Sequence, residues 1–558
     1  MKRWIALLTA LLVGTLLGLF ALKLPSPAKA DGAGFSALRA RADIDIIARA
    51  PHSVWEQDSL EPVRKHLRER LAGLGLASAT MRYGEVTDRS GHRYPLENLS
   101  ASIPGKSGSF MLLVAHYDSA PRKRNGEASC GAADDGYGVA TLLEIAGILA
   151  RTKTPFENGV RFLFTDAEET GLLGARAEMT QNLAAYRDVN LVINLEARGV
   201  KGPAVMFETG PNNRATLELF QKAHRPFGYS FASDVYRRMP NGTDFSEFTR
   251  RGFAGLNFAV LDDLSSYHTP RDNPDNISLA SLQHYGEQVL PMVQAYTGQA
   301  RYGGAQAFVS AENTVFLSWL PGLFLAWPVG WDRLFCGFLA VTFLVWAGWT
   351  LARGRAKLLS AALWFLAWLG FALASLGLGL GVSWLASKAT GLPWQFTYMP
   401  NVPMERPILW VLVLGLTLGG SALVARRSQA QPEDRSPVLG ALAVNLALLA
   451  VMAWVLPGGT FLCSLPSLAV LIAVIGSDLF RSPWIAGLGV VFTVSLFVPV
   501  LHTLFLALTA GAFGAVLLLA AFPMALVASL GLVARGANVP CDEAAVVNER
   551  RAMADGKR

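Results

Sequence analysis

Cysteine and charged residues are scarce in this chain of 558 residues. Of its four cysteines, Cys336 and Cys463 fall in apolar segments, Cys541 lies in the C-terminal tail, and only Cys130 lies in a polar region. No framework of disulfide bonds can therefore be built there. Charged residues make up 16% of the chain and hydrophobic residues 52%. This balance excludes a wholly soluble protein and predicts that a large part lies in a membrane.

The most polar part of the chain has no excess of basic residues. The formal net charge is +7, but residues 31–300 contain 29 Lys and Arg residues and 32 Asp and Glu residues. The positive excess therefore flanks the apolar segments, where it orients membrane spans. This distribution gives no support for binding to nucleic acid, and the lipid bilayer is the expected partner of the apolar part.

The first 30 residues predict a signal anchor or a signal peptide. Lys2 and Arg3 precede an uncharged stretch of 19 residues, 4–22, which is long enough to span a bilayer. Its length favours a retained anchor, although the small-x-small sequence at 28–30 also suits cleavage. With either outcome, the two basic residues are expected to stay in the cytoplasm and residues 31–300 to cross the membrane.

Residues 31–300 show the alternation of strand-like and helix-like segments that is typical of an α/β domain. Helix-like stretches at 138–150 and 214–224 separate apolar runs with the length of strands, at 98–103, 110–115, 160–165, 190–195 and 255–260. Such alternation predicts a mixed, largely parallel sheet flanked by helices.

The rest of the chain predicts a C-terminal multi-span α-helical membrane domain. An interfacial linker at 301–333 leads into this domain, residues 334–534, and a polar tail follows at 535–558. The candidate spans are 334–352, 358–386, 407–425, 437–455, 460–477, 484–501 and 503–534. The last block can form one long helix or two short ones, so seven or eight helices are expected. None has a charged residue in its interior, which argues against ion-coupled transport.

Basic residues recur in every second loop between these spans. They occur at 353–357, at 426–435 and at 481. Because positive loops stay in the cytoplasm, residues 31–300 are expected on the opposite side, in the periplasm or in the lumen of an organelle.

Side chains that can bind metal ions gather just after the predicted strands. In chain order they are His116, Asp118, Asp134, Asp135, Asp166, Glu168, Glu169, Glu196 and His268. Open α/β sheets build their sites at the carboxyl ends of strands. Two imidazoles with three or four carboxylates suit a pair of divalent cations that share one carboxylate. Imidazole ligands favour Zn²⁺, with Mn²⁺ or Co²⁺ as substitutes.

Simpler interpretations of these residues are also open. A histidine at a strand end is often an ordinary hydrogen-bonded residue, and one of Asp134 and Asp135 suits the N-cap of the following helix. Two adjacent aspartates repel each other unless a cation compensates, which favours the metal site.

The motifs HxD, ADDGxG, DAEExGLxG, NLE and YHT occur in this order between residues 116 and 269. Together they resemble the dinuclear zinc aminopeptidases of the aminopeptidase Y family, metallopeptidase family 28. The N-terminal anchor and the multi-span C-terminal part resemble its membrane-bound branch, which includes endoplasmic reticulum metallopeptidase and vacuolar membrane protease. The resemblance covers residues 90–295 and implies a zinc aminopeptidase-like fold.

The resemblance also implies two zinc ions with three ligands each. It assigns His116, Asp134 and Glu196 to one ion, and Asp134, Glu169 and His268 to the other. Many soluble members of the family have aspartate where this chain has Glu196, whereas the membrane-bound branch also has NLE. Glu196 is therefore interpreted as a longer ligand.

Roles in catalysis follow from the same resemblance. Glu168 is the implied general base, Asp118 orients His116, and the peptide bond at 134–135 is cis. Tyr267 is a candidate donor to the oxyanion, with a merely packed tyrosine as the alternative.

Three further residues are candidates for substrate binding, namely Arg198, Glu208 and Asp244. Arg198 and Glu208 are expected just past strand ends, where ordinary salt bridges are the more common role, and a helix cap would explain Asp244 equally well. The expected function is hydrolysis of peptides with a free N-terminus, as an aminopeptidase. A glutaminyl cyclase, which uses one zinc ion, and a peptidase-like domain that serves the membrane part remain alternatives. The oligomeric state is left open.

Overall fold

The chain divides into two compact units. A computed structural model describes residues 2–88, 91–395, 399, 402–428, 433–480 and 482–536. The first unit is Ala21–Trp331, and the second combines Met1–Phe20 with Asp332–Arg558. Most of the predicted polar tail, with Cys541, lies outside the described residues.

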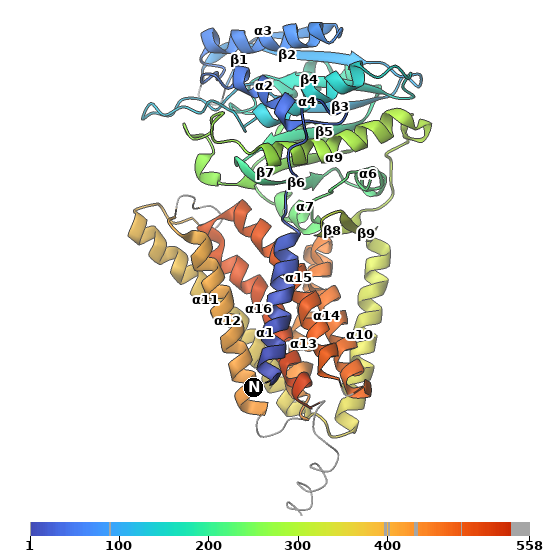
Figure 1. Cartoon of the computed structure of the whole chain (residues 1–558), viewed down its shortest axis with the longest axis vertical. Helices are drawn as coiled ribbons and strands as arrows, with labels where there is room; N and C mark the ends of the chain where they lie inside the picture. Colours follow the sequence, from blue (N-terminus) through green and yellow to red (C-terminus); the bar gives the residue numbers. More distant parts are fainter. Residues whose placement is uncertain are drawn as a thin grey trace, which may run out of the picture. The chain divides into compact units, whose positions relative to one another are not determined.

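A seven-stranded sheet forms the centre of the Ala21–Trp331 unit, in the order β1-β2-β4-β3-β5-β7-β6 (Figure 1). The four neighbours β4, β3, β5 and β7 are parallel, and the outer strands pair antiparallel. The strands are β1 (Ser78–Thr87), β2 (Arg93–Ile103), β3 (Phe110–His116), β4 (Gly159–Thr165), β5 (Val189–Ala197), β6 (Lys201–Thr209) and β7 (Gly255–Asp262). The predicted α/β class, with a mixed, largely parallel sheet, is confirmed. All five predicted strands are present, whereas β1 and β6 were not predicted.

Both faces of this sheet are buried, because helices cover each of them. Along β3, Met111, Leu113 and Ala115 contact one apolar cluster, and Leu112 and Val114 contact the other. This explains why β3 is a continuous apolar run and not an alternating one. The first cluster is covered by α2 (Ala37–Ile47), α3 (Gln57–Gly73), α4 (Gly136–Ala150), α6 (Arg214–Phe220) and α9 (Leu279–Gly298), the second by α5 (Leu173–Gln181) and α8 (Asp244–Thr249).

Helix α4 is the most deeply buried of these helices. Every residue from Gly136 to Leu149 is buried, which fits its almost entirely apolar sequence. The predicted helix at 138–150 is therefore confirmed. The one predicted at 214–224 is shorter than expected, because α6 ends at Phe220.

The segment predicted as an interfacial linker contains a β-hairpin. Strands β8 (Thr314–Leu320) and β9 (Leu323–Pro328) pair antiparallel across a turn at Pro321–Gly322. Gly322 has φ of 78°, a conformation that glycine adopts without steric cost. The next helix begins at Val329, before the expected start at 334. Helix α7 (Ser230–Tyr236) packs on both β6 and β8.

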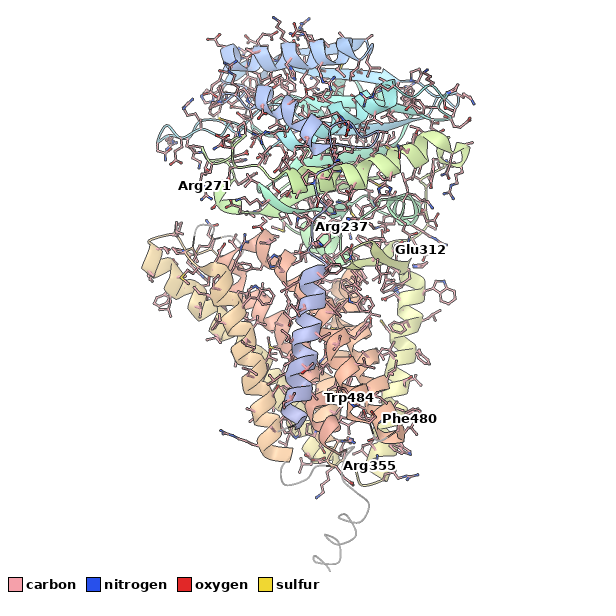
Figure 2. All side chains as sticks on the ribbon, viewed as in Figure 1. Arg237, Arg271, Glu312, Arg355, Phe480 and Trp484 are labelled. Atoms are coloured by element: carbon pink, nitrogen blue, oxygen red, sulfur yellow. The ribbon has the colours of Figure 1, made fainter. Side chains whose placement is uncertain are left out.

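Seven helices of the other unit are long and apolar enough to cross a membrane, so the chain is a multi-pass membrane protein. Large apolar side chains such as Phe480 and Trp484 are exposed on their surface (Figure 2). The helices are α10 (Val329–Ala352), α11 (Leu358–Thr390), α12 (Glu405–Ser428), α13 (Ser436–Val455), α14 (Phe461–Phe480), α15 (Pro483–Leu508) and α16 (Phe513–Gly536).

The block 503–534 is neither one long helix nor two short spans. Its first residues complete α15, a short turn follows at Ala510–Ala512, and α16 is a single helix. The described residues therefore contain seven such helices after the sheet domain, not eight.

The N-terminal segment is a helix, α1 (Lys2–Phe20), that packs on α15. Two glycines of α1 lie in this contact. A β-carbon on Gly14 would lie 2.9 Å from Cβ of Val494, and one on Gly18 would lie 2.6 Å from Cβ of Val498. Small residues four positions apart allow such close approach of two membrane helices.

Candidate metal centre

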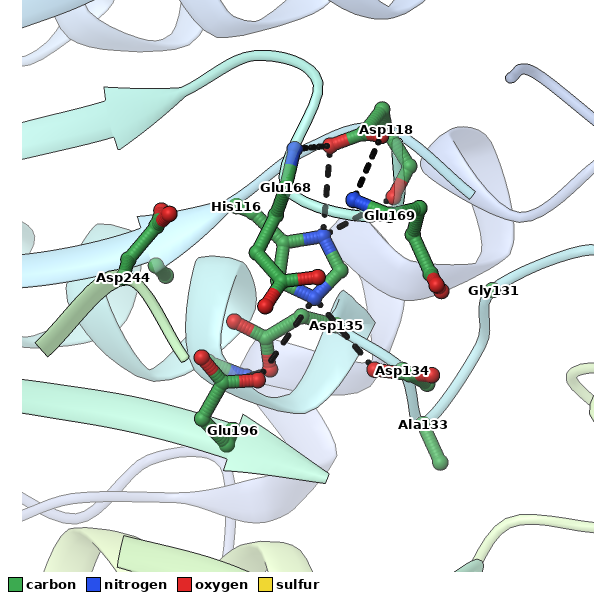
Figure 3. A network of polar contacts seen from close by, with 12 residues as sticks. His116, Asp118, Gly131, Ala133, Asp134, Asp135, Glu168, Glu169, Glu196 and Asp244 are labelled. Atoms are coloured by element: carbon green, nitrogen blue, oxygen red, sulfur yellow. Dashed lines mark hydrogen bonds and ion pairs between the residues drawn. The ribbon is translucent and has the colours of Figure 1, made fainter. Parts of the chain in front are cut away.

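Ligand-type side chains from five segments meet at the carboxyl ends of the parallel strands. Figure 3 shows His116, Asp134, Glu169 and Glu196 of this group. His116 is the last residue of β3, and Glu196 is the last residue but one of β5. Glu169 follows β4, His268 follows β7, and Asp134 lies just before α4. Parallel neighbours end at the same edge of a sheet, so residues far apart in sequence become neighbours here.

The first triad consists of His116, Asp134 and Glu196. Nε2 of His116 lies 3.3 Å from Oδ1 of Asp134 and 3.7 Å from Oε2 of Glu196. All three side chains are buried. One ligand atom of each lies within 4.8 Å of the others.

The second triad consists of Asp134, Glu169 and His268. Nε2 of His268 lies 2.9 Å from Oε2 of Glu169 and 3.1 Å from Oδ2 of Asp134. The two triads therefore use different oxygens of Asp134. The peptide bond between Asp134 and Asp135 is cis.

Several atoms of the two triads lack ordinary hydrogen-bond partners. In the described part of the chain, Nε2 of His116, Oδ2 of Asp134, Oε1 of Glu169 and Nε2 of His268 are buried and form no hydrogen bond, although both imidazole nitrogens lie close to carboxylate oxygens. Buried polar atoms are nearly always paired, so these atoms fit a site that binds a cation. Together the two triads offer two imidazoles and three carboxylates, and Asp134 belongs to both triads. This set of ligands fits a pair of zinc ions.

The buried carboxylates of the site also favour the binding of cations. Burial raises the pKa of Glu169 to about 7 and that of Glu196 to about 8, with other carboxylates adding to the effect. Burial lowers the pKa of His268, but the nearby Glu169 and Asp134 outweigh it and raise the value to about 10. Burial likewise raises the pKa of Glu168 well above its usual value. Bound cations would replace the protons that these carboxylates otherwise retain.

Asp118 connects two loops of the site. Nδ1 of His116 lies 3.0 Å from the main-chain oxygen of Asp118 and 3.4 Å from its carboxylate. The same carboxylate accepts hydrogen bonds from the backbone N–H groups of Glu168, at 3.1 Å, and Glu169, at 3.4 Å. Asp118 thus contacts the imidazole mainly through its backbone, while its side chain holds the loop after β4.

The adjacent residues Glu168 and Glu169 point their carboxylates in different directions (Figure 3). Glu168 projects beside His116, whereas Glu169 reaches toward the second triad. Ala167, with φ of 59°, turns the chain between β4 and these two residues. The two glutamates therefore occupy chemically distinct positions.

Asp135 and Asp166 belong to neither triad. Asp135 is the N-cap of α4, and its carboxylate accepts a hydrogen bond from the N–H of Gly138 at 3.0 Å. Asp166 pairs with the guanidinium of Arg64 at 2.7 Å. Of the two aspartates before α4, one therefore caps the helix and the other faces the candidate metal centre.

Tyr267 lies beside the second triad. Its ring stacks on that of His268, with 3.7 Å between the centroids. Burial, with a further contribution from nearby carboxylates, raises the pKa of Tyr267 well above its usual value. Its hydroxyl group therefore keeps its proton and can act as a hydrogen-bond donor.

The three candidate substrate-binding residues differ in their positions. Arg198 follows β5, and its positive charge acts on Tyr236 and Tyr267. Glu208 lies inside β6 and not past a strand end as expected from the sequence, because β6 continues to Thr209. Asp244 is buried at the first position of α8.

Asp244 does not cap its helix, because the preceding Thr243 does so. The carboxylate of Asp244 instead accepts a hydrogen bond from the hydroxyl of Thr165, and its other oxygen is buried without a hydrogen-bond partner among the described residues. The negative charge of Asp244 acts on both Glu168 and Glu196.

Two asparagines that were not predicted connect the first triad with Glu208. Nδ2 of Asn194 donates to Oε1 of Glu196 at 2.9 Å and to Oδ1 of Asn257 at 3.0 Å. Nδ2 of Asn257 in turn donates to Oε2 of Glu208 at 3.0 Å. Asn194 lies two residues before Glu196, so the alternation of side chains along a strand could have placed both on one face.

Residues 98–293 match the family model described as Peptidase family M28. A putative endoplasmic reticulum metallopeptidase 1-A of Caenorhabditis elegans is 33% identical over 195 residues, which cover 34% of this chain and 21% of that protein. A vacuolar membrane protease of Candida tropicalis is 30% identical over 254 residues, which cover 43% of this chain and 27% of that protein. The match thus spans about a quarter of the length of these relatives.

Solved structures of similar proteins include a zinc-dependent exopeptidase from Parabacteroides distasonis, at 20% identity and a TM-score of 0.39, covering 48% of this chain and 99% of that one. A glutaminyl cyclase from Porphyromonas gingivalis is 21% identical at a TM-score of 0.38, covering 47% of this chain and 98% of that one. The matching family model identifies a peptidase family M28 domain at residues 98–293, and the chain that carries it is similar over this region to endoplasmic reticulum metallopeptidases and vacuolar membrane proteases.

Proposed function

We propose that this chain is a membrane-anchored dinuclear zinc aminopeptidase. The observation that supports this most strongly is the pair of triads that share Asp134 and leave buried ligand atoms without hydrogen-bond partners. His116, Asp134 and Glu196 would hold one ion, and Asp134, Glu169 and His268 the other. Mn²⁺ or Co²⁺ would be possible substitutes.

The reaction proposed is hydrolysis of a peptide bond. When bound, the two ions lower the pKa of a water molecule and polarise the scissile carbonyl group. The carboxylate of Glu168 would accept a proton from the attacking water and deliver it to the leaving nitrogen. The hydroxyl of Tyr267 donates a hydrogen bond to the carbonyl oxygen of the substrate as negative charge develops there.

The acidic surroundings of the site favour a substrate with a free α-amino group. An α-ammonium group is a cation, and Glu208 and Asp244 are buried carboxylates that neither triad uses. Burial raises the pKa of Glu208 to about 7, so a bound cation would favour its charged form. Arg198 would balance this charge by contacting an oxygen of the substrate. We therefore propose that the enzyme removes residues from the N-terminus of peptides.

The test compares peptides with free and acetylated N-termini, using the full chain purified in detergent. Hydrolysis of the free peptides, with loss of turnover after acetylation, is expected. Equal cleavage of both would contradict the aminopeptidase proposal and indicate an endopeptidase. A wild-type chain that contains fewer than two zinc ions would contradict the dinuclear site.

A peptide that begins with glutamine tests the glutaminyl cyclase alternative. A cyclase would release ammonia without shortening this peptide, whereas an aminopeptidase would release glutamine. The complete second triad, Asp134, Glu169 and His268, favours the peptidase, because one zinc ion would leave these ligands unused. Absence of both reactions in the zinc-loaded chain would favour a domain that serves the membrane part.

We also propose that α1 is retained as a membrane anchor and that the peptidase unit lies on the non-cytoplasmic side. The close packing of Gly14 and Gly18 on α15 supports retention, since the contact buries a face of both helices. The alternation of basic loops supports the orientation.

A further inference from the structure

Asp272 is a buried carboxylate next to the metal centre that belongs to neither triad. It lies four residues after His268, and its side chain is 1% exposed. One of its oxygens, Oδ1, accepts a hydrogen bond from the N–H of Ala133 at 2.7 Å. The other, Oδ2, accepts from the hydroxyl of Ser129 at 3.2 Å and the N–H of Asp134 at 3.3 Å. A fourth hydrogen bond involves the backbone, where the N–H of Cys130 donates to the main-chain oxygen of Asp272 at 3.2 Å.

These contacts leave Asp272 unsuited to bind a metal ion itself. Both carboxylate oxygens already accept from N–H or O–H donors, and the residue is in neither group of potential ligands. It does not cap α4 either, because Asp135 has that role. What Asp272 does is hold the segment 129–134, which carries the shared ligand Asp134.

This segment is a tight loop with little room to change shape. The hydroxyl of Ser129 accepts a hydrogen bond from the N–H of Gly131 at 3.1 Å. Gly131 has φ of 66°, and a β-carbon there would lie 2.8 Å from the main-chain oxygen of Asp134. Only glycine meets both conditions without strain. Movement of the loop is therefore transmitted to Asp134.

The backbone of Asp272 is also bonded to the turn that carries His268. The N–H of Asp272 donates to the oxygen of Thr269 at 3.0 Å, and the hydroxyl of Thr269 donates to the oxygen of Ser266 at 2.8 Å. These bonds close the turn that carries His268. Asp272 thus joins the loops of two ligands of the second triad, through its carboxylate on one side and its backbone N–H on the other.

We propose that Asp272 is a positioning residue that fixes Asp134 relative to His268 and thereby sets the affinity of the second triad for zinc. The proposal rests on the dinuclear site proposed above. Groups that orient metal ligands typically change metal affinity or activity by about 10–100-fold when they are removed. A loss of this size is expected when the carboxylate of Asp272 is replaced.

The test compares Asp272→Asn with Asp275→Asn in the full chain in detergent. Asp275 is exposed in the same loop and is therefore a matched control. At a buffered zinc concentration that loads two ions into the wild type, Asp272→Asn is expected to retain close to one. Its kcat/KM should recover in excess zinc, and zinc should raise its Tm less than that of the wild type. Asp275→Asn should match the wild type in each measurement.

Two results would overturn the proposal. One is retention of two zinc ions by Asp272→Asn with unchanged affinity. The other is a fall in Tm that is equal with and without zinc, since this is the signature of a purely structural residue. A wild-type chain with fewer than two zinc ions would overturn both this proposal and the dinuclear site, so the two failures can be distinguished.

Ser129→Ala provides a milder variant if Asp272→Asn does not fold. It removes one of the hydrogen bonds to Asp272 and the bond to Gly131, but leaves the carboxylate in place. A smaller loss of zinc affinity, in the same direction, is expected. Unchanged zinc affinity in Ser129→Ala would contradict the proposal.

Discussion

At the scale of single residues, the motifs in the sequence contain the side chains that the structure brings together in the two triads. His116, Glu196 and His268 could be placed because each follows an apolar run that reads as a strand. Asp272 and Arg64 could not be assigned contacts in this way. Their partners lie on remote segments, and no local periodicity links them. Sequence alone therefore indicates candidate ligands better than the residues that hold those ligands in place.

Glu168 and Glu169 offer a test of roles at neighbouring positions. Glu168→Gln keeps the size of the side chain but removes its basicity, so kcat should fall by on the order of a hundredfold or more. The variant should still contain two zinc ions, because the carboxylate of Glu168 belongs to neither triad. Zinc content and kcat, measured on the same preparation, check this expectation.

Glu169→Gln is the matched comparison. It weakens a ligand of the second triad, so zinc content should fall toward one ion and activity should recover partly in excess zinc. Loss of zinc from Glu168→Gln, with two ions retained by Glu169→Gln, would show that the two roles are exchanged.

At the scale of helices and strands, the buried elements were predictable and the edges were not. The five predicted strands include all four parallel central strands, whose apolar runs reflect burial on both faces. The two missed strands, β1 and β6, are the edges of the sheet. Strand β1 is half exposed, and β6 contains Gly202 and Pro203, which weaken any strand pattern but are tolerated at an edge.

A buried histidine connects α9 to the edge strand β6 and makes that contact sensitive to acid. Nδ1 of His284 accepts a hydrogen bond from the N–H of Ala204 at 3.1 Å, and Nε2 lies 3.0 Å from the main-chain oxygen of Arg225. Both bonds are satisfied by the neutral ring, with its proton on Nε2. Burial lowers the pKa of His284 from 6.5 to about 4.

The folded chain should therefore lose stability as the pH falls from 6.5 to 4. In that range the unfolded chain binds a proton at His284 that the folded chain does not, so unfolding is favoured. The shift from 6.5 to about 4 corresponds to about 3 kcal/mol for the whole range. Thermal unfolding of the full chain between pH 4 and 7.5, with a chelator present to remove metal, measures this loss.

His284→Gln lacks the titrating group and should show a weaker dependence of Tm on pH than the wild type. His224→Gln alters an exposed histidine of a nearby loop and is expected to keep the dependence of the wild type. Identical acid profiles for the wild type and His284→Gln would show that this histidine does not titrate on unfolding.

At the scale of the whole molecule, the chain joins an α/β peptidase unit to a helical membrane unit through two covalent connections. Helix α1 runs into the peptidase unit at Ala21, and the chain leaves that unit at Trp331, within α10. With α1, the described residues of the membrane unit form eight apolar helices, an even number. The sequence predicted seven or eight helices after the linker, because 503–534 lacks a charged residue to mark the helix ends. In the structure α15 ends at Leu508 and α16 is a single helix.

Eight spans would place both ends of the described chain on the same side of the membrane and the peptidase unit on the other. Basic residues at 353–357 and 426–435 lie in the α10–α11 and α12–α13 connections, which would share the side of Lys2 and Arg3. The positive-inside rule assigns this side to the cytoplasm. The peptidase unit is therefore expected in the periplasm or an organelle lumen.

Single cysteines in a chain whose four natural cysteines are replaced by alanine can test this orientation. Arg124→Cys lies in an exposed loop of the peptidase unit, and Lys357→Cys lies at the start of α11 on the opposite side of the expected topology. In intact cells or sealed vesicles of known orientation, a membrane-impermeant thiol reagent should label only one of the two. The Arg124→Cys variant should react from the non-cytoplasmic side, and Lys357→Cys only after the membrane is permeabilised. The reverse pattern would place the peptidase unit in the cytoplasm, and labelling of both without permeabilisation would show that the two sites are not separated by a membrane.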